Sequence, residues 1–515
     1  MSWSRTYRRV GLMVTSLLAV VCLAAVASAQ SGGKEADSES QKKRELSPEE
    51  RKAAEFLSRA EKSYRGGQWY KARELYKQAY EASPSDSPVR VQAALGRATL
   101  LWEQGNYGSA RKHVGEALEL AKKLQLNAAI GRLLLTLGHT QASQGRLAKA
   151  EQTLGHCVKL AEEQNDPVFG PLCKLNHRLV RKLQGKSVGS EAEYRKALKK
   201  LETVDSPLTA GLSLAKTAEL YATGGQRARA FKLLEQADAQ YDNAGSMPAK
   251  ARNRMLKARF LQESGEWSEA RKHLQGLAKT FQSMGSKPAL VDVLGLLGND
   301  AQHRNAYGEA KQHYERGLKV ARATGSPQLV AKVQVAMCEV GAGTGDASAE
   351  VYCEEAIAKF SQLGMPLMEA KAHAAQARLA QQTGHLEKAR DEFLSAIEIN
   401  DKRVHAEIRD AALERNSLTN LCQIEMRIKM EGAFYRCREA LESLEGASAG
   451  EQMVAATHYA LGNSATREGH VDEGIEHLQK AAKMYAEMQP ADLAMYGDTK
   501  LRLGAGFTKT DGPEK

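Results

Sequence analysis

A six-residue motif recurs through most of this 515-residue chain at a period of about 40 residues. It places a turn residue, usually Gly, two positions before a bulky residue and five before a small one, as in Gly67–Ala72, Gly105–Ala110 and Gly265–Ala270. The small residue falls at positions 72, 110, 150, 190, 230, 270, 310, 349, 389, 433 and 474. A fixed period of this size is typical of a repeat array, in which stacked copies share one continuous core.

Each repeat is predicted to be two antiparallel helices joined at the motif, since Gly suits a helix end that needs a left-handed residue. Further small residues recur before and after the motif, where they let two helix backbones approach closely. Prolines recur at about the same spacing as the motif and support the same division into repeats independently. They lie at positions 167, 207, 248, 288, 327 and 366. Each lies between one hairpin and the next, where proline is tolerated in a first helical turn. We therefore predict an all-α solenoid of about eleven helix pairs.

The pattern resembles the tetratricopeptide repeat family over roughly residues 53–490. The first copy carries the family's residues in order: Phe56, Ala60, Gly67, Trp69, Ala72, Tyr76, Ala79 and Pro84. The period exceeds the family's usual 34 and is similar to the longer-helix subgroup of kinesin light chain and some bacterial sensor regions. The resemblance implies a right-handed superhelix whose first helices line a concave groove for peptides or proteins. Three copies depart from the pattern, with Arg178, Met337 and Leu421 at a small-residue position.

The N-terminus is predicted to be a secretion signal, residues 1–29. Arg8 and Arg9 precede an apolar stretch, Val10–Val26, which is followed by the small-x-small sequence Ala27–Ala29. The alternative is an uncleaved membrane anchor, because the apolar stretch approaches spanning length. Residues 30–50 are polar and are expected to be a flexible linker. The array is assigned to residues 51–490, and a capping helix and tail to residues 491–515.

Charge gives no indication of nucleic-acid binding. The net charge is +11, and it would fall by three, to about +8, if Arg5, Arg8 and Arg9 were removed with the signal. An excess of this size, spread over many helices, is usually a solvated surface.

Six cysteines remain after the predicted signal, in three neighbouring pairs: Cys157 and Cys173, Cys338 and Cys353, Cys422 and Cys437. The midpoint of each pair coincides with a predicted turn, which puts the two residues at one height on facing helices, the geometry that a disulfide needs. An exported protein also resides where disulfides persist. The alternatives are cysteines that replace alanine in helix packing, and a zinc site made by His156, Cys157, Cys173 and His177.

No phosphate-binding loop, GxSxG sequence or HExxH spacing occurs, so we expect a protein that is not an enzyme and needs no cofactor. The first-helix positions expected to face the groove are polar with a basic bias, which would suit an acidic segment of a partner. An ordinary solvated inner face is the alternative. These positions are Arg132, His139, Arg252, Arg259, Gln262, Asn299, Gln302, His303, Arg378, Gln381, Asn463 and Arg467.

The function expected from these observations is that of an exported scaffold that binds proteins or peptides, periplasmic and active in bacterial envelope assembly or organisation. Extracellular and membrane-anchored forms remain open. The alternative function is a ligand-responsive sensor or regulatory subunit that acts by a change of solenoid curvature. The sequence names no partner.

Overall fold

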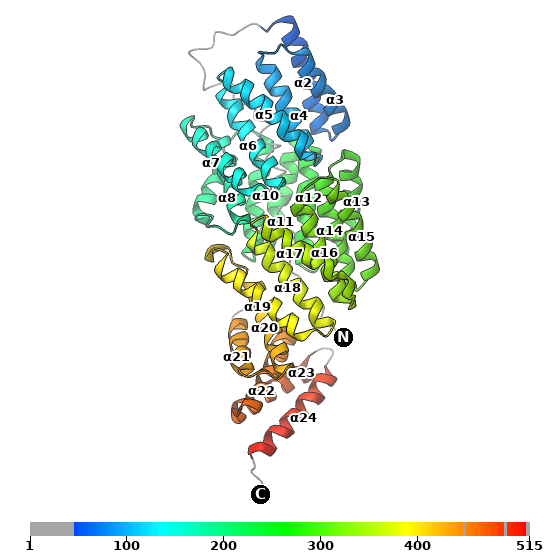
Figure 1. Ribbon diagram of the computed structural model, residues 1–515. Coiled ribbons are helices and arrows are strands. Elements are labelled where there is room, and N and C mark those ends of the chain that lie inside the picture. The colour runs from blue at the N-terminus through cyan, green and yellow to red at the C-terminus, as the bar shows by residue number, and fades with distance from the viewer. Residues whose placement is uncertain (1–45, 446–449, 489–491, 511–515) are drawn as a thin grey trace. The chain divides into compact units, whose positions relative to one another are not determined.

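The computed structural model describes residues 46–445, 450–488 and 492–510, and within these ranges the chain is helical without any β-strand. The predicted signal and most of the predicted linker lie outside the described residues. Eleven helical hairpins follow one another along the chain, each with a first and a second helix (Figure 1). The all-α solenoid of eleven helix pairs is therefore confirmed.

The first helices are α2 (Pro48–Arg65), α4 (Pro88–Glu103), α6 (Asn127–Ser143), α8 (Phe169–Leu183), α10 (Pro207–Thr223), α12 (Met247–Glu263), α14 (Lys287–His303), α16 (Pro327–Thr344), α18 (Pro366–Gln382), α20 (Ala411–Arg427) and α22 (Glu451–Glu468). The second helices are α3 (Trp69–Ala82), α5 (Tyr107–Lys123), α7 (Leu147–Glu163), α9 (Glu191–Glu202), α11 (Arg227–Asn243), α13 (Trp267–Met284), α15 (Tyr307–Arg322), α17 (Glu350–Gln362), α19 (Leu386–Lys402), α21 (Ala433–Leu444) and α23 (Val471–Glu487). A last helix, α24 (Leu493–Thr510), follows, and two short 3-10 helices are η1 (Ala347–Ala349) and η2 (Ala406–Ile408).

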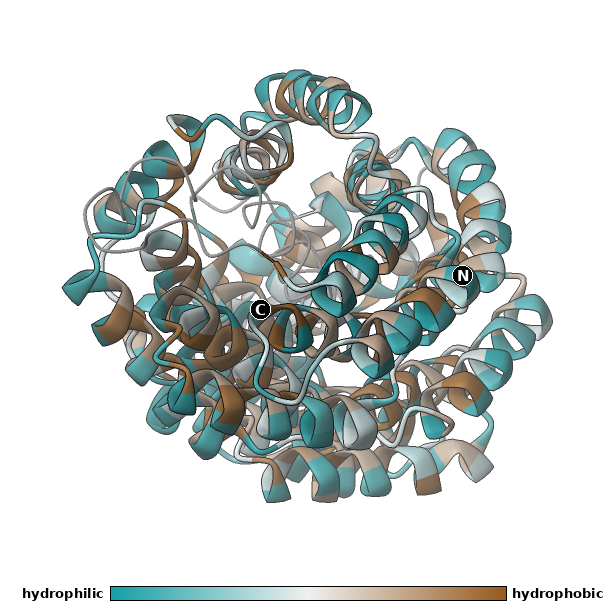
Figure 2. Ribbon diagram, turned by 90° about the horizontal axis from the view of Figure 1, so that it is seen from above, coloured by the Kyte–Doolittle hydropathy of each residue, from teal (hydrophilic) through white to brown (hydrophobic). Residues whose placement is uncertain are grey.

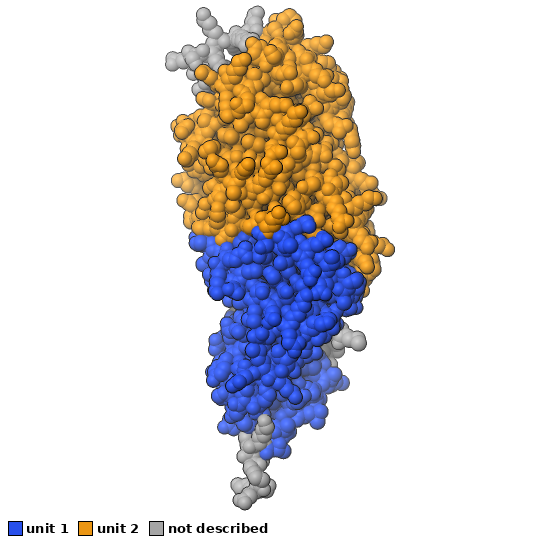
Figure 3. Space-filling view, viewed as in Figure 1, with its two compact units in different colours: residues 1–11, 337–361, 365–515 blue, residues 12–336, 362–364 orange. Residues whose placement is uncertain are grey.

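The helices form two compact units (Figure 3). Of the described residues, unit 2 contains 46–336 and 362–364, and unit 1 contains 337–361, 365–445, 450–488 and 492–510. Hydrophobic and hydrophilic stretches alternate along the helices (Figure 2), as amphipathic helices with one buried face require. No helix among the described residues is both long and apolar enough to span a membrane.

The motif glycines adopt the left-handed conformation that the hairpin turn requires. The φ angles of Gly67, Gly105 and Gly265 are 74°, 75° and 87°. Asn305 takes the same conformation, with φ of 58°, in the one motif that begins with Asn. Asparagine tolerates this region better than other residues with a side chain, so the turn is preserved there without glycine.

Small residues permit the close packing of each hairpin. Ala72, Ala110 and Ala150 are fully buried. Gly298 of α14 lies against the ring of Tyr314 in α15, and a Cβ at Gly298 would lie 2.3 Å from a ring carbon. An alanine there would force the ring or the helix to move, because such a distance is far inside van der Waals contact.

The fourth repeat shows how the array accommodates a departure from the pattern. Arg178 stands in α8 at a small-residue position, and its guanidinium donates hydrogen bonds to the carbonyls of Val188, Gly189 and Ser190 at 2.6, 2.7 and 3.1 Å. Residues 186–190 before α9 have no regular secondary structure, and α9 begins at Glu191. Ser190 caps α9 with a reciprocal hydrogen-bond pair to Glu193.

The cysteines pair as their spacing predicts. The Cα atoms lie 5.7 Å apart for Cys157 and Cys173, 5.2 Å for Cys338 and Cys353, and 4.7 Å for Cys422 and Cys437, with each pair of sulfur atoms at bonding distance. All six side chains are buried. These positions fit three disulfides, joining α7 to α8, α16 to α17 and α20 to α21.

Within unit 2, hairpin turns of early repeats contact loops of much later repeats. Ser286 donates a hydrogen bond to the carbonyl of Glu103, and Ser326 donates one to that of Ser143, each across 183 residues of chain. The turn glycine Gly105 packs against Thr324 and Pro288. The chain of unit 2 therefore returns onto itself after more than four repeats, which no sequence period indicates.

Candidate binding cavity in unit 1

Most of the side chains expected in the groove connect repeats instead of lining an open surface. Four of them, His139, Arg252, Arg259 and Gln262, are buried in unit 2. Arg252 forms an ion pair with Glu103, and Gln262 donates a hydrogen bond of 2.8 Å to the carbonyl of Leu296. Burial raises the pKa of Glu103 to about 7, although the charge of Arg252 opposes this.

Other members of the set make similar contacts. The Tyr314 hydroxyl lies 2.7 Å from both Asn299 Oδ1 and Gln302 Oε1, which share its single proton as acceptors. The ring of His303 stacks on Trp267 at 4.1 Å between centroids, and the guanidinium of Arg132 lies over Phe169. In unit 1, Arg378 pairs with Glu339 at 2.6 Å. The role of this set in binding a partner stays a prediction.

Three of the set, Gln381, Asn463 and Arg467, are brought together in unit 1. They line a cavity of about 870 Å³ between α18, α20, α22 and α24. The first three of these helices are the first helices of the last three repeats, so the cavity lies on the side where the family resemblance places a groove. Helix α24 forms a further wall, through Met495, Asp498, Arg502 and neighbouring residues.

Much of the cavity wall is apolar. The contributing side chains come from α20, α22, α23 and α24, and they include Met426, Met453, Ala456, Tyr485 and Met495. Met453 and Ala456 are one helical turn apart on α22, and Tyr459 follows after another turn, so one face of α22 supplies all three. Methionine side chains adapt to ligands of irregular shape. The polar groove positions predicted from the sequence did not include this apolar face.

Several charged groups of the cavity wall are engaged by the protein itself. The Tyr459 hydroxyl donates a hydrogen bond to Asp498, and burial together with that carboxylate raises the pKa of Tyr459. Asp492 accepts a hydrogen bond of 3.1 Å from the backbone N–H of Met495 at the start of α24. Arg467 donates to the carbonyls of Met426 and Met430 and so holds α22 to the end of α20.

Two cations on the cavity wall differ from these. Arg427 and Lys429 are exposed at the end of α20 and line the cavity. Among the described residues, no hydrogen bond or ion pair joins either side chain to another group. Sequence reasoning missed both because they lie at and beyond the C-terminal end of a first helix, outside the register used to select groove positions.

The zinc alternative is not favoured by the geometry. The sulfur atoms of Cys157 and Cys173 lie at bonding distance from one another, which leaves neither as a thiolate ligand. Among the described residues, no group of three or more His, Cys, Asp or Glu side chains is arranged to hold a metal ion.

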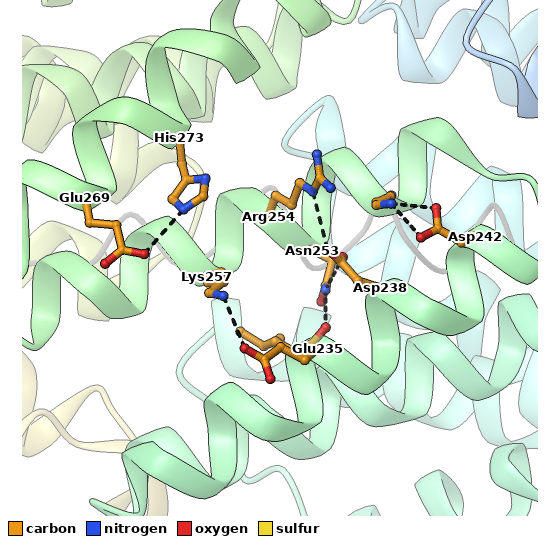
Figure 4. A network of polar contacts seen from close by, with 10 residues as sticks. Glu235, Asp238, Asp242, Asn253, Arg254, Lys257, Glu269 and His273 are labelled. Atoms are coloured by element: carbon orange, nitrogen blue, oxygen red, sulfur yellow. Dashed lines mark hydrogen bonds and ion pairs between the residues drawn. The ribbon is translucent and has the colours of Figure 1, made fainter.

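A row of ion pairs, the polar ladder, joins basic side chains of α12 to acidic side chains of α11 (Figure 4). Lys250 contacts Asp242 at 2.6 Å, and Arg254 contacts Asp238 at 3.3 Å. Lys257 completes the ladder with Glu235 at 3.5 Å. The basic stripe of α12 is thus neutralised by the acidic stripe of α11, so it is not a free basic surface for an acidic partner.

Residues 90–163, which span α4 to α7, match the family model described as "Tetratricopeptide repeat". This segment of the chain consists of tetratricopeptide repeats. Tetratricopeptide repeat folds generally bind protein partners. A comparison with curated protein sequences gave no match.

Solved structures with a similar fold include three distant proteins. The human IFIT1 dimer with PPP-AAAA is 16% identical, with a TM-score of 0.43, and the match covers 86% of this tetratricopeptide repeat chain and 96% of that one. The APC/C hetero-tetramer Cut9-Hcn1 is 12% identical (TM-score 0.40; 87% and 95% covered). A signal transduction ATPase with a tetratricopeptide repeat sensor from Pyrococcus horikoshii is 13% identical (TM-score 0.46; 82% and 66% covered). At these values the likeness carries no functional argument.

Proposed function

We propose that this tetratricopeptide repeat protein is an exported, non-catalytic scaffold that binds a segment of a partner protein in the cavity of unit 1. The observation that carries the proposal is the cavity itself, because three residues selected from the sequence as groove positions line it together. A solenoid suits this role, since each repeat adds surface while contacting its neighbours. The two unpaired cations, Arg427 and Lys429, favour an acidic segment.

Export is supported by the cysteines. Three buried pairs at disulfide distance suit an oxidising compartment, since disulfides are rare where thiols are kept reduced. The amino-terminal sequence, with its basic start and apolar stretch, supports secretion into the periplasm and a role in bacterial envelope assembly or organisation. Amino-terminal sequencing of the exported protein tests cleavage after Ala29, and an intact Met1 would favour a membrane anchor.

A pair of matched variants tests the binding site. Ala456→Trp places an indole in the cavity, whereas Ala486→Trp places one on the exposed face of α23. In affinity capture from envelope extracts, the partner retained by the wild type should be retained by Ala486→Trp and lost by Ala456→Trp. Equal retention by both variants would place the partner elsewhere.

The second candidate is a ligand-responsive sensor or regulatory subunit. It is favoured by the size of the cavity, because about 870 Å³ falls in the range of roughly 300–1,000 Å³ typical of small-molecule sites. Small-angle scattering with and without extracts of low-molecular-weight compounds tests it. A change in the radius of gyration is expected if a ligand alters the curvature of the solenoid.

A further inference from the structure

We propose that the cavity of unit 1 binds a small amphiphilic anion, an apolar chain that carries one carboxylate. The inference goes beyond the proposed function, which concerns a protein partner, and it holds even if that partner binds elsewhere. If both hold, the small molecule and the partner segment compete for the same walls.

The apolar chain is indicated by the composition and depth of the wall. Met453 and Tyr485 are buried, 8% and 1% exposed, yet both line the cavity. Met495 of α24 also lines it. Removing apolar surface of a cavity from water by an apolar ligand is favourable. These side chains therefore favour an apolar occupant over a sugar or an inorganic ion.

The charge expected of the ligand's head group follows from the charged side chains of the cavity wall. On the acidic side, Asp498 is bound by the Tyr459 hydroxyl and Asp492 by the backbone of α24. On the basic side, Arg467 is bound by two backbone carbonyls and by Glu468 at 2.9 Å. The side chains of Arg427 and Lys429 have no such partner among the described residues. The wall carries four cationic and two acidic side chains, Arg502 being the fourth cation, so its net charge is positive and favours an anion.

The geometry also indicates how the occupant is oriented. Arg427 and Lys429 are exposed at the end of α20, whereas Met453 and Tyr485 are buried on α22 and α23. A carboxylate at the exposed cations stays partly hydrated, and its chain extends toward the buried wall. This arrangement places the charged head in water and the apolar tail out of it, which is the lowest-cost orientation for an amphiphile.

The test is isothermal titration calorimetry of the full-length exported protein with three probes below their micellar concentrations. Dodecanoate has the proposed tail and charge, dodecyltrimethylammonium has the same tail with the opposite charge, and hexanoate has the same charge with a shorter tail. We expect saturable binding of dodecanoate and binding at least roughly tenfold weaker for each of the other two probes, since tenfold corresponds to about 1.4 kcal/mol.

Two sets of variants locate the site. Ala456→Trp should weaken dodecanoate roughly tenfold or more, and Ala486→Trp should leave it unchanged. The double variant Arg427→Glu, Lys429→Glu should weaken it roughly fivefold, in keeping with the modest strength of exposed ion pairs, and should reduce the preference over dodecyltrimethylammonium. Lys483→Glu, the same charge reversal on the exposed face of α23, is the matched control.

The inference is overturned if dodecanoate does not bind, if both head groups bind equally, or if Ala456→Trp binds it like the wild type. These results are separate from the capture experiment. Loss of partner capture in Ala456→Trp without any dodecanoate binding would support the protein-binding function alone. Dodecanoate binding that Ala456→Trp removes, with partner capture intact, would support the amphiphile site alone.

Discussion

The hydroxyl of Ser326 donates a hydrogen bond of 2.7 Å to the backbone carbonyl of Ser143, 183 residues earlier in the chain. Both residues are buried in unit 2. Ser286 makes the corresponding hydrogen bond to the carbonyl of Glu103, one repeat earlier, at 3.2 Å. Two consecutive repeats thus use the same residue type to join turns that are distant in sequence. We call these contacts between early and late repeats of unit 2 its closure, and both serines take part in it.

Replacing Ser286 and Ser326 by alanine together should destabilise the protein. Each change removes a buried hydrogen bond and leaves a carbonyl without that donor, at a cost of about 1 kcal/mol each. The midpoint of urea unfolding, followed by circular dichroism, should therefore fall. Ser283→Ala is the control, because its exposed hydroxyl bonds only to Thr280 within the same helix. An equal effect of the control would contradict a role in closure.

Gly105→Ala should cost more stability than Gly225→Ala. The two glycines have nearly the same φ, 75° and 78°, so the backbone penalty of a left-handed alanine is the same for both. A Cβ at Gly105 would lie 2.8 Å from Thr324 and 3.3 Å from Pro288, whereas nothing lies within 4 Å at Gly225. Overpacking typically adds 1–3 kcal/mol, so we expect a difference of roughly 1 kcal/mol or more.

The measurement is the midpoint of urea unfolding of the two glycine variants. Because both variants carry the same local strain, the difference between their midpoints reports the contact between distant turns. Identical unfolding midpoints would show that unit 2 is not closed at Gly105 in solution.

His139→Gln should make the protein less sensitive to acid. Burial lowers the pKa of His139 to about 4 from an ordinary value near 6.5, although its hydrogen bond with Asn176 opposes this. Between pH 6.5 and pH 4 the unfolded chain binds the proton more readily than the folded one, so stability contributed by neutral His139 above pH 6.5 is lost as the pH falls. Glutamine cannot titrate, which removes this dependence.

The measurement is the unfolding free energy of wild type and His139→Gln at several pH values. The difference between them should change by on the order of 3 kcal/mol between pH 7 and pH 4. His273→Gln, at a histidine on the surface of α13 (Figure 4), is the control for the substitution itself. A variant profile parallel to that of the wild type would exclude His139 as the acid-sensitive group.

Reduction should destabilise the hairpins that contain the cysteines. Each pair closes a loop of 15 or 16 residues, for which loss of the crosslink costs about 3 kcal/mol in the chain-entropy model. Non-reducing peptide mapping of the exported protein should recover the pairs 157–173, 338–353 and 422–437. Six free thiols would contradict the pairing, and an unchanged unfolding midpoint under reducing conditions would contradict its contribution to stability.

The hairpins were predictable because their determinants are local. A left-handed Gly67 or Gly105, a small residue five positions later and a proline in the next first turn each act within one repeat, so period and register are visible in the sequence. The cysteine pairs were predictable for the same reason, since equal distances from a tight turn place Cys338 opposite Cys353. Gln381, Asn463 and Arg467 were assigned to the groove from register alone.

The sequence by itself determined the helices, their pairing and the position of each turn, because nearest neighbours along the chain set all of these. Only the tertiary structure decided which inner side chains are buried and which line a cavity. Arg252 meets Glu103 across 149 residues of chain, and the cavity needs α24, which carries no repeat motif. The ion pair and the cavity both depend on the sum of small rotations from one repeat to the next. Many packing contacts set these rotations together, so no single residue encodes them.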